Sequence, residues 1–230
     1  MTIVYRPHTL KGTETLVFDL DDTLYPHGHF LSDARFFEML SQFAATQNGL
    51  SFDHAHHLTQ TYIAEGSTDV MKSWQAEHAF DIEGFALHID TQDISHMQPN
   101  EQIKQFLNDW QGRIVVFTNA HTTHAERLLE HLHLRQHVEH ICDYTTRGGR
   151  MKPEITIYEE LLHRLNENPE NCIMFEDKHK NLAPAKHMGM GTVLFTPEPQ
   201  EFTYVDRWYP EMPIWLNSLE ILNTQQRLYS

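Results

Sequence analysis

Residues 14–23 read ETLVFDLDDT, a short apolar run that ends abruptly in acidic residues. Four similar runs follow it along the chain: RIVVFTN around Val115, EHICDYT around Ile141, NCIMFED around Met174 and GTVLFT around Val193. Continuous apolar runs of this length, rich in β-branched and aromatic residues, are typical of strands in a parallel sheet that is covered on both faces. We therefore predict five buried strands.

Helical patterns lie between these runs. Apolar residues at helical spacing predict helices over residues 125–134 and 153–165, the second with a proline in its first turn. Residues 181–188 predict a short helix closed by Gly189, and a final helix is predicted over residues 217–227. Because strand and helix alternate, we predict a doubly wound α/β domain.

The stretch after the first strand follows another pattern. Its apolar residues recur three to four positions apart, as in FLSDARFFEMLSQFAA, which predicts a bundle of about four helices. The expected organisation is an α/β core formed by residues 1–26 and 95–230, with a helical insert formed by residues 27–94.

Composition limits the classes of partner. The 230 residues are 40% hydrophobic and 21% charged, as in ordinary globular proteins. With 17 basic and 32 acidic side chains the formal charge is −15, which repels nucleic acid and anionic lipid. No apolar run approaches a membrane span, and residues 1–12 lack a secretory signal, so a cytoplasmic location is the default expectation. We expect a small-molecule substrate, no polynucleotide and no membrane partner.

Cysteine and histidine invite other hypotheses. Cys142 and Cys172 both lie in predicted strands, which favours buried thiols over a disulfide. On a continuous helix, His133 and His137 would lie four apart and could share a metal ion. However, the stretch HAERLLEHLHLRQH predicts an amphipathic helix with its histidines mostly on the polar face. We predict no zinc site.

Polar residues end the predicted strands. In an open parallel sheet, ligands bind beyond the carboxyl ends of the strands. Each group alone has a simpler interpretation, as a helix cap, a solvated charge or an acidic turn. Because all of these residues are expected at the same edge of the sheet, we predict that they form one site. The residues expected at this rim are Asp19, Asp21, Thr118, Asn119, Lys152, Glu176 and Asp177.

This set suits phosphoryl chemistry. Converging carboxylates repel one another unless a cation joins them, and an oxygen-only ligand set favours Mg²⁺. The hydroxyl of Thr118 and the charge of Lys152 suit phosphate oxygens. Asp19 can attack phosphorus to form an aspartyl-phosphate. Asp21 can protonate the leaving oxygen and later accept a proton from water, for which we expect its crowded carboxylate to have a raised pKa.

With these residues in place, the chain resembles the haloacid dehalogenase superfamily in all four of its motifs. The matching stretches are VFDLDDTLYP, VVFTNA, RMKPE and MFEDKHKNLAPAKHMGM, and the likeness runs from about Thr13 to about Phe195. The resemblance implies a Rossmann-like core with a helical cap of the C1 type.

It also implies a role for each motif residue. Asp19 would be the nucleophile and Asp21 the general acid and base, while Thr118, Asn119 and Lys152 would bind the phosphoryl group. Mg²⁺ would be held by Asp19, the backbone carbonyl of Asp21, Asp177 and, directly or through water, Glu176.

A narrower likeness concerns the substrate. The combination of DLDDTLYP with NLAPAKHMGM resembles the pyrimidine 5′-nucleotidase branch, whose members dephosphorylate nucleoside monophosphates such as UMP and CMP. The insert stretches TYIAEGSTDVMKSWQAEH and FALHID are similar to that branch more loosely. One departure is Lys178, which stands where the family usually carries a small residue, often serine.

Alternatives remain at this stage. The substrate could instead be a sugar phosphate or a small phosphoglycolate-like compound. A 2-haloacid dehalogenase would share the nucleophile but needs no acid for the leaving group, and a non-catalytic scaffold has little reason to keep the whole set. Candidates to line the substrate cleft are Tyr25, His27, Tyr62, Ser67 and Trp74. Tyr62 and Trp74 have the alternative of packing inside the insert.

Overall fold

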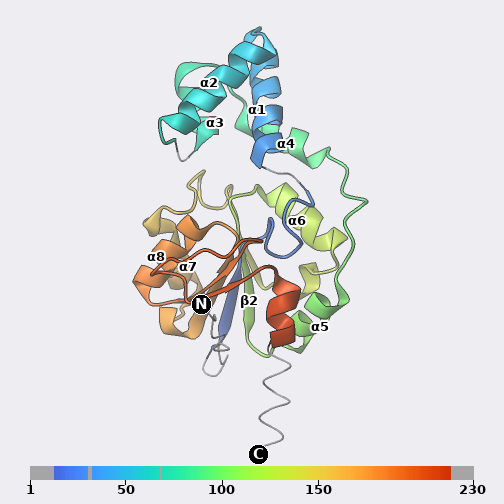
Figure 1. Ribbon diagram of the computed structural model, residues 1–230, viewed down its shortest axis with the longest axis vertical. Coiled ribbons are helices and arrows are strands. Elements are labelled where there is room, and N and C mark those ends of the chain that lie inside the picture. The colour runs from blue at the N-terminus through green and yellow to red at the C-terminus, as the bar shows by residue number, and fades with distance from the viewer. Residues whose placement is uncertain (1–12, 31–32, 68, 219–230) are drawn as a thin grey trace, which may run out of the picture. The chain divides into compact units, whose positions relative to one another are not determined.

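The computed structural model describes residues 13–30, 33–67 and 69–218 (Figure 1). The chain divides into two compact units, one formed by residues 1–27 and 97–230 and the other by residues 28–96. These bounds lie within two residues of the predicted core and insert. Each unit has its own hydrophobic core.

The first unit is built on a six-stranded sheet in which every neighbouring pair is parallel. The strand order is β3-β2-β1-β4-β5-β6. All five predicted strands are confirmed, and a sixth short strand follows them. The strands are β1 (Thr15–Phe18), β2 (Arg113–Phe117), β3 (His140–Cys142), β4 (Cys172–Glu176), β5 (Gly191–Phe195) and β6 (Arg207–Tyr209).

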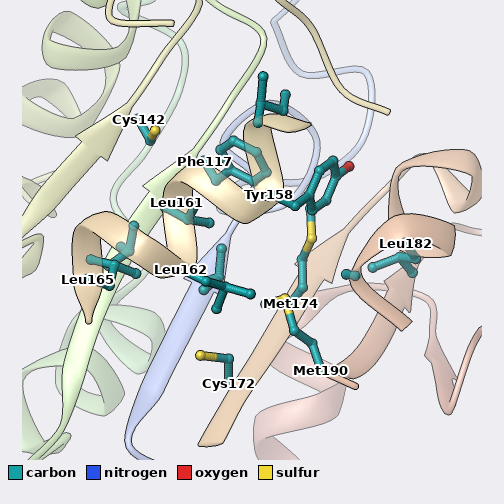
Figure 2. Packing of buried hydrophobic residues seen from close by; sticks show 14 of the residues in the cluster. Phe117, Cys142, Tyr158, Leu161, Leu162, Leu165, Cys172, Met174, Leu182 and Met190 are labelled. Carbon is teal, nitrogen blue, oxygen red and sulfur yellow. The ribbon is translucent and has the colours of Figure 1, made fainter. Parts of the chain in front are cut away.

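Helices cover both faces of this sheet (Figure 1). One face carries Val17, Phe117 and Met174, which pack in one cluster with helix α7 (Ile155–Leu165). Figure 2 shows Tyr158, Leu161 and Leu162 of α7 within this cluster. Leu182 of α8 (His179–Met188) belongs to it as well. Successive residues of a strand point to opposite faces of the sheet. Because helices cover both faces, residues of both kinds are buried, which explains why the strands are mostly apolar.

The opposite face is closed by aromatic side chains. Trp215 lies in a helical stretch over residues 212–218 and packs against Phe175 and Phe195, with ring centroids 4.6 and 6.3 Å away. Phe106, from α5 (Glu101–Asp109), meets Trp215 edge to face at 5.2 Å. The predicted helix over residues 217–227 lies outside the described residues beyond residue 218.

Helix α6 (Thr122–His131) differs from its prediction. It begins and ends three residues earlier than the predicted range 125–134. His133 adopts a left-handed φ of 57°, and a separate 3-10 turn follows at η1 (Arg135–His137). His133 and His137 are therefore not on one helix face, so the geometry that would let them share a metal ion does not arise.

The second unit consists of the four predicted helices: α1 (Asp33–Asn48), α2 (Phe52–Ala64), α3 (Val70–Glu77) and α4 (Ile82–Asp90). Ser51, Asp69 and Asp81 cap α2, α3 and α4, each accepting a hydrogen bond from the backbone N–H three residues on. Buried apolar residues of this unit, among them Leu40 and Phe85, pack together in one cluster.

Cys142 and Cys172 are free and buried, as expected. In the part of the chain that the structure describes, no helix has the length and apolar character needed to cross a membrane.

Candidate active site

The site forms where the strand order reverses. β1 and β4 are neighbours at the centre of the sheet, and their register pairs Phe18 with Phe175. The N–H of Asp19 continues this ladder and donates to the carbonyl of Phe175 at 2.9 Å. The residues that follow both strands therefore emerge side by side, in the crevice where open α/β sheets bind ligands.

A buried lysine joins the two strand ends. Nζ of Lys152 lies 2.7 Å from Oδ1 of Asp19 and 2.7 Å from Oε1 of Glu176. The lysine side chain is 1% exposed and that of Glu176 is fully buried. Burial lowers the pKa of Lys152, but the charges of Asp19 and Glu176 outweigh it and raise the pKa above its ordinary value. The ammonium group therefore stays charged.

Lys152 is one of several donors to Glu176. Oε1 of Glu176 also accepts from Nδ2 of Asn181 at 2.5 Å, and its Oε2 accepts from the backbone N–H of Lys178 at 2.7 Å. Burial raises the pKa of Glu176, yet Lys152 and these hydrogen bonds lower it overall. Glu176 is thus an ionised anchor for Lys152, a task that the motif alone did not reveal.

The carboxylates next to this lysine carry an excess of negative charge. Ligand atoms of Asp19, Glu176 and Asp177 lie within 4.8 Å of one another. Burial raises the pKa of Asp19 to about 7, with Glu176 and Asp21 adding to the rise that Lys152 opposes. Burial, then the charges of Glu176 and Asp19, raise the pKa of Asp177 well above its ordinary range. A bound cation would relieve this repulsion.

The donor set fits a hard cation. Asp19, Glu176 and Asp177 offer only oxygen atoms, the ligands that Mg²⁺ prefers. A second group formed by Asp22, His27 and Asp177 shares one member with the first. In it, exposed His27 lies 3.1 Å from the carboxylate of Asp22. His27 therefore lies at the edge of the carboxylate group, next to Asp22.

This charge excess gives a stability prediction. A folded-state pKa of about 7 against an ordinary 3.8 means that folded Asp19 keeps a proton that the unfolded chain has lost. Stability without a divalent cation should therefore fall as pH rises through this interval. The Asp19→Asn variant cannot ionise there, and Lys152 keeps its partner Glu176.

We expect Asp19→Asn to melt several degrees above the wild type at pH 8 in a chelator, with the gap closing toward pH 5. Mg²⁺ should raise the melting temperature of the wild type more than that of the variant. Differential scanning calorimetry from pH 5 to 8, with EDTA or Mg²⁺, measures both effects. A gap that did not change with pH would contradict this account of Asp19.

Thr118 and Asn119 follow β2, as predicted, but their side chains make different contacts. Oγ1 of buried Thr118 accepts from the N–H of Ala120 at 3.0 Å, which leaves its own hydrogen to donate. Asn119 binds the backbone of Lys152. Oδ1 of Asn119 accepts from the N–H of Lys152 at 2.8 Å, and Nδ2 of Asn119 donates to the carbonyl of Lys152 at 3.1 Å. The side chain of Asn119 therefore positions Lys152.

Arg147 is a buried residue that the sequence analysis missed. Its Nε donates to the carbonyl of Asp143 at 2.8 Å, and one terminal nitrogen donates to the carbonyl of Thr118 and to Oδ1 of Asn119. Its guanidinium carbon lies 5.0 Å from the centre of the Phe117 ring. Arg147 ties the segment after β3 to the end of β2. In sequence it stands within TTRGGR, which suggests only an exposed turn.

Asp21 has two side-chain partners. Its Oδ1 accepts from the hydroxyl of Tyr25 at 2.7 Å and lies 3.0 Å from Nε2 of His124. Burial raises the pKa of Asp21, but the charge and hydrogen bond of His124, together with Tyr25, lower it overall. The expectation that crowded carboxylates raise this pKa is wrong, because the nearest groups are donors.

The positions of Tyr25 and His124 differ from those predicted from the sequence. Tyr25, a predicted cleft residue, is buried against Asp21 and is 5% exposed. His124 belongs to the stretch whose histidines were expected mostly on the polar face of a helix, yet it is buried in the first turn of α6. Its position in the sequence could have indicated a place near the site, because α6 begins shortly after the end of β2.

The candidates in the insert lie mostly within its own core. Trp74 is fully buried, and its Nε1 donates to Oγ1 of Thr59 at 3.1 Å. Tyr62 meets Trp74 edge to face at 5.7 Å and donates to Glu77 at 3.1 Å. Ser67 is partly exposed, and its hydroxyl lies 2.8 Å from that of Ser73. Of the three candidates, Ser67 has the most exposed side chain.

Helix starts near the strand ends differ from those elsewhere. Side chains cap α2, α3, α4 and α5, but among the described residues none caps α6, α7 or α8. Helices α6 and α8 begin just after the ends of β2 and β4. Uncapped N–H groups carry the positive end of the helix dipole, which favours an anion at this rim.

Solved structures share this fold. A haloacid dehalogenase superfamily phosphatase from Thermococcus onnurineus superposes with a TM-score of 0.64 at 16% identity, over 91% of this chain and 97% of that chain. The magnesium-bound hydrolase YfnB from Bacillus subtilis gives 0.58 at 15% identity, over 91% and 98%. L-2-haloacid dehalogenase from Xanthobacter autotrophicus gives 0.58 at 11% identity, over 90% and 98%.

The sequence itself matches a family profile that is described as haloacid dehalogenase-like hydrolase, over residues 13–189. This range contains every motif residue placed above, from Asp19 to Asp177. Both the predicted α/β fold class and the predicted superfamily are confirmed. The chain belongs to the haloacid dehalogenase-like hydrolase family.

Proposed function

We propose that this hydrolase is a Mg²⁺-dependent phosphatase that removes phosphate from a small phosphomonoester through Asp19. The observation that carries the proposal is the buried lysine that bridges Asp19 and Glu176. Lys152 supplies a fixed positive charge beside the nucleophile, where the negative charge of a phosphoryl group would otherwise repel it.

The first step forms an aspartyl-phosphate. Oδ1 of Asp19 is held by Lys152, so the other carboxylate oxygen attacks phosphorus and the bond to the leaving oxygen breaks. Asp21 donates a proton to that oxygen. Approach of a phosphate dianion raises the pKa of Asp21, because a nearby negative charge disfavours its ionised form. Lys152 and the hydroxyl of Thr118 bind the phosphoryl oxygens.

The second step releases phosphate. Asp21, now ionised, takes a proton from a water molecule that attacks phosphorus, and the bond to Asp19 breaks. Asp19, Asp177 and the backbone carbonyl of Asp21 would hold Mg²⁺, with Glu176 beside them. When bound, the ion withdraws negative charge from the phosphoryl oxygens and offsets the repulsion among the carboxylates.

The helical insert is proposed to act as a cap. Insertion of α1–α4 directly after the first motif supports this role, because a cap excludes water and selects the substrate. Ser67 is the insert residue proposed to face the substrate, while Tyr62 and Trp74 maintain the fold of the insert. Tyr25 and His27 act from the core, on Asp21 and Asp22 respectively.

The proposed substrate is a nucleoside 5′-monophosphate such as UMP or CMP. The support is the resemblance of DLDDTLYP and NLAPAKHMGM to the pyrimidine 5′-nucleotidase branch. Lys178 follows the paired acids and its charge acts on Asp177, which supports an altered affinity for phosphate. A sugar phosphate or a phosphoglycolate-like compound is the alternative substrate.

Release of phosphate tests this function. Purified protein is incubated with UMP, CMP, AMP, sugar phosphates, phosphoglycolate and 4-nitrophenyl phosphate, with Mg²⁺ or with EDTA. We expect turnover with Mg²⁺, highest for the pyrimidine nucleotides, and loss of turnover in EDTA. Chloride release from 2-chloropropionate without phosphatase activity would instead make the protein a dehalogenase, and inactivity on every compound would favour a scaffold.

A further inference from the structure

Both side-chain hydrogen bonds to Asp21 end on the same carboxylate oxygen, Oδ1. Tyr25 and His124 both bind Oδ1, at 2.7 and 3.0 Å. In the described part of the chain, the hydrogen bonds to this carboxylate reach Oδ1 alone. A carboxylate has acceptor sites on both oxygens, so two donors on one oxygen fix its rotation and leave Oδ2 for other partners. The side chain of Asp21 is 38% exposed, whereas that of His124 is 7% exposed.

The geometry also defines the state of His124. An ionised carboxylate accepts hydrogen bonds and cannot donate them, so Nε2 of His124 carries the hydrogen in this contact. The histidine lies in the first turn of α6 with 5% exposure, so neighbouring groups enclose its ring. A buried, rigid donor is suited to positioning a carboxylate, because ordering it at each turnover costs little entropy.

The two donors come from segments far apart in sequence. Tyr25 lies four residues after Asp21, whereas His124 is 103 residues away and follows β2. Their meeting at one oxygen links the motif of β1 to the helix that follows the Thr118 motif. Asn119 makes a similar link to Lys152, so the same segment holds both the acid and the lysine.

We propose that His124 and Tyr25 are positioning residues that orient Asp21 so that Oδ2 exchanges the proton in both steps. The inference rests on the proposed phosphatase function and extends it to Tyr25, near the end of the first motif, and to His124, which lies outside the four motifs. Loss of either donor lets the carboxylate rotate, which slows proton transfer to the leaving oxygen and later from water. Attack by Asp19 on a substrate that needs no proton is unaffected.

The test compares leaving groups. We measure kcat/KM for 4-nitrophenyl phosphate, whose leaving group needs no proton, and for the best alkyl phosphate of the substrate panel. The variants are His124→Ala, His124→Gln and Tyr25→Phe. His131→Ala is the matched control, because His131 lies on the same helix but binds the carbonyl of Met97 at 2.8 Å. Melting temperatures of all variants establish that they are folded.

We expect His124→Ala to lose about 100-fold in kcat/KM on the alkyl phosphate and far less on 4-nitrophenyl phosphate. Rapid quench should show aspartyl-phosphate accumulating with the nitrophenyl substrate, because hydrolysis still needs Asp21. His124→Gln, which restores an N–H donor, should recover part of the alkyl activity. Tyr25→Phe should show the same substrate dependence with a smaller loss, and His131→Ala should match the wild type.

Equal losses on both substrates, or no loss, in folded His124 and Tyr25 variants would overturn the positioning role while leaving the phosphatase intact. If the His124→Ala variant does not fold, Tyr25→Phe decides by the same comparison. A wild-type protein inactive on both substrates with Mg²⁺ present would overturn the proposed function, and the inference with it.

Discussion

We expect the Asp19→Asn variant to lose phosphate release by about four orders of magnitude while keeping its fold. The amide is a poor nucleophile, so no aspartyl-phosphate forms. Lys152 keeps Glu176 as its partner, so the substitution leaves no unpaired buried cation. The measurement is single-turnover phosphate release with Mg²⁺ at saturating substrate, with circular dichroism as the check on folding.

Asp53→Asn serves as the matched control, because this exposed aspartate lies in the first turn of α2. It should keep wild-type turnover. Acid quenching adds a second readout: the wild type should yield protein-bound phosphate from a labelled substrate and the Asp19→Asn variant none. Turnover of the Asp19→Asn protein above one-tenth of the wild-type rate would exclude covalent catalysis by this residue.

Lys152→Met should have the second-largest effect, on activity and on stability together. The lysine is the buried cation between Asp19 and Glu176, and its removal leaves two carboxylates without compensation. Breaking such a buried ion pair costs about 3–5 kcal/mol. We expect urea unfolding in EDTA to show a loss of this order at pH 8, with turnover below detection.

Removing the charges of the two carboxylates as well separates the loss of stability from the loss of activity. A triple variant, Lys152→Met with Asp19→Asn and Glu176→Gln, removes the buried charges and should recover most of the stability but none of the activity. Lys104→Met is the control, since Lys104 pairs with Glu101 on the surface and its loss should cost under about 1 kcal/mol. A Lys152→Met protein as stable as the wild type would show that the buried carboxylates do not depend on this lysine.

The fold followed from local signals because the strands are buried on both faces. Each of β1, β2, β4 and β5 contains at least three consecutive apolar residues, a pattern that can be recognised in the sequence alone. β6 escaped prediction because it has three residues and only Tyr209 is fully buried. The end of α6 was misplaced because apolar spacing continues past His131, while the backbone turns at His133.

Position at the end of a strand made several residues of the candidate site predictable. Asp19, Thr118 and Asp177 follow strands, so the direction of the sheet brings them to one rim. The partners of these residues depend on side-chain packing between distant segments, which no local pattern encodes. His124 and Arg147 are examples, since one contacts Asp21 and the other the end of β2.

The two outermost strands of the sheet have a consequence for the protein at high concentration. β3 and β6 flank the sheet, and each is three residues long. An edge strand exposes N–H and C=O groups on which a strand of another molecule can pair, and a short edge offers few of them. Together with a net charge of −15, this disfavours growth into β-rich aggregates while the core stays folded.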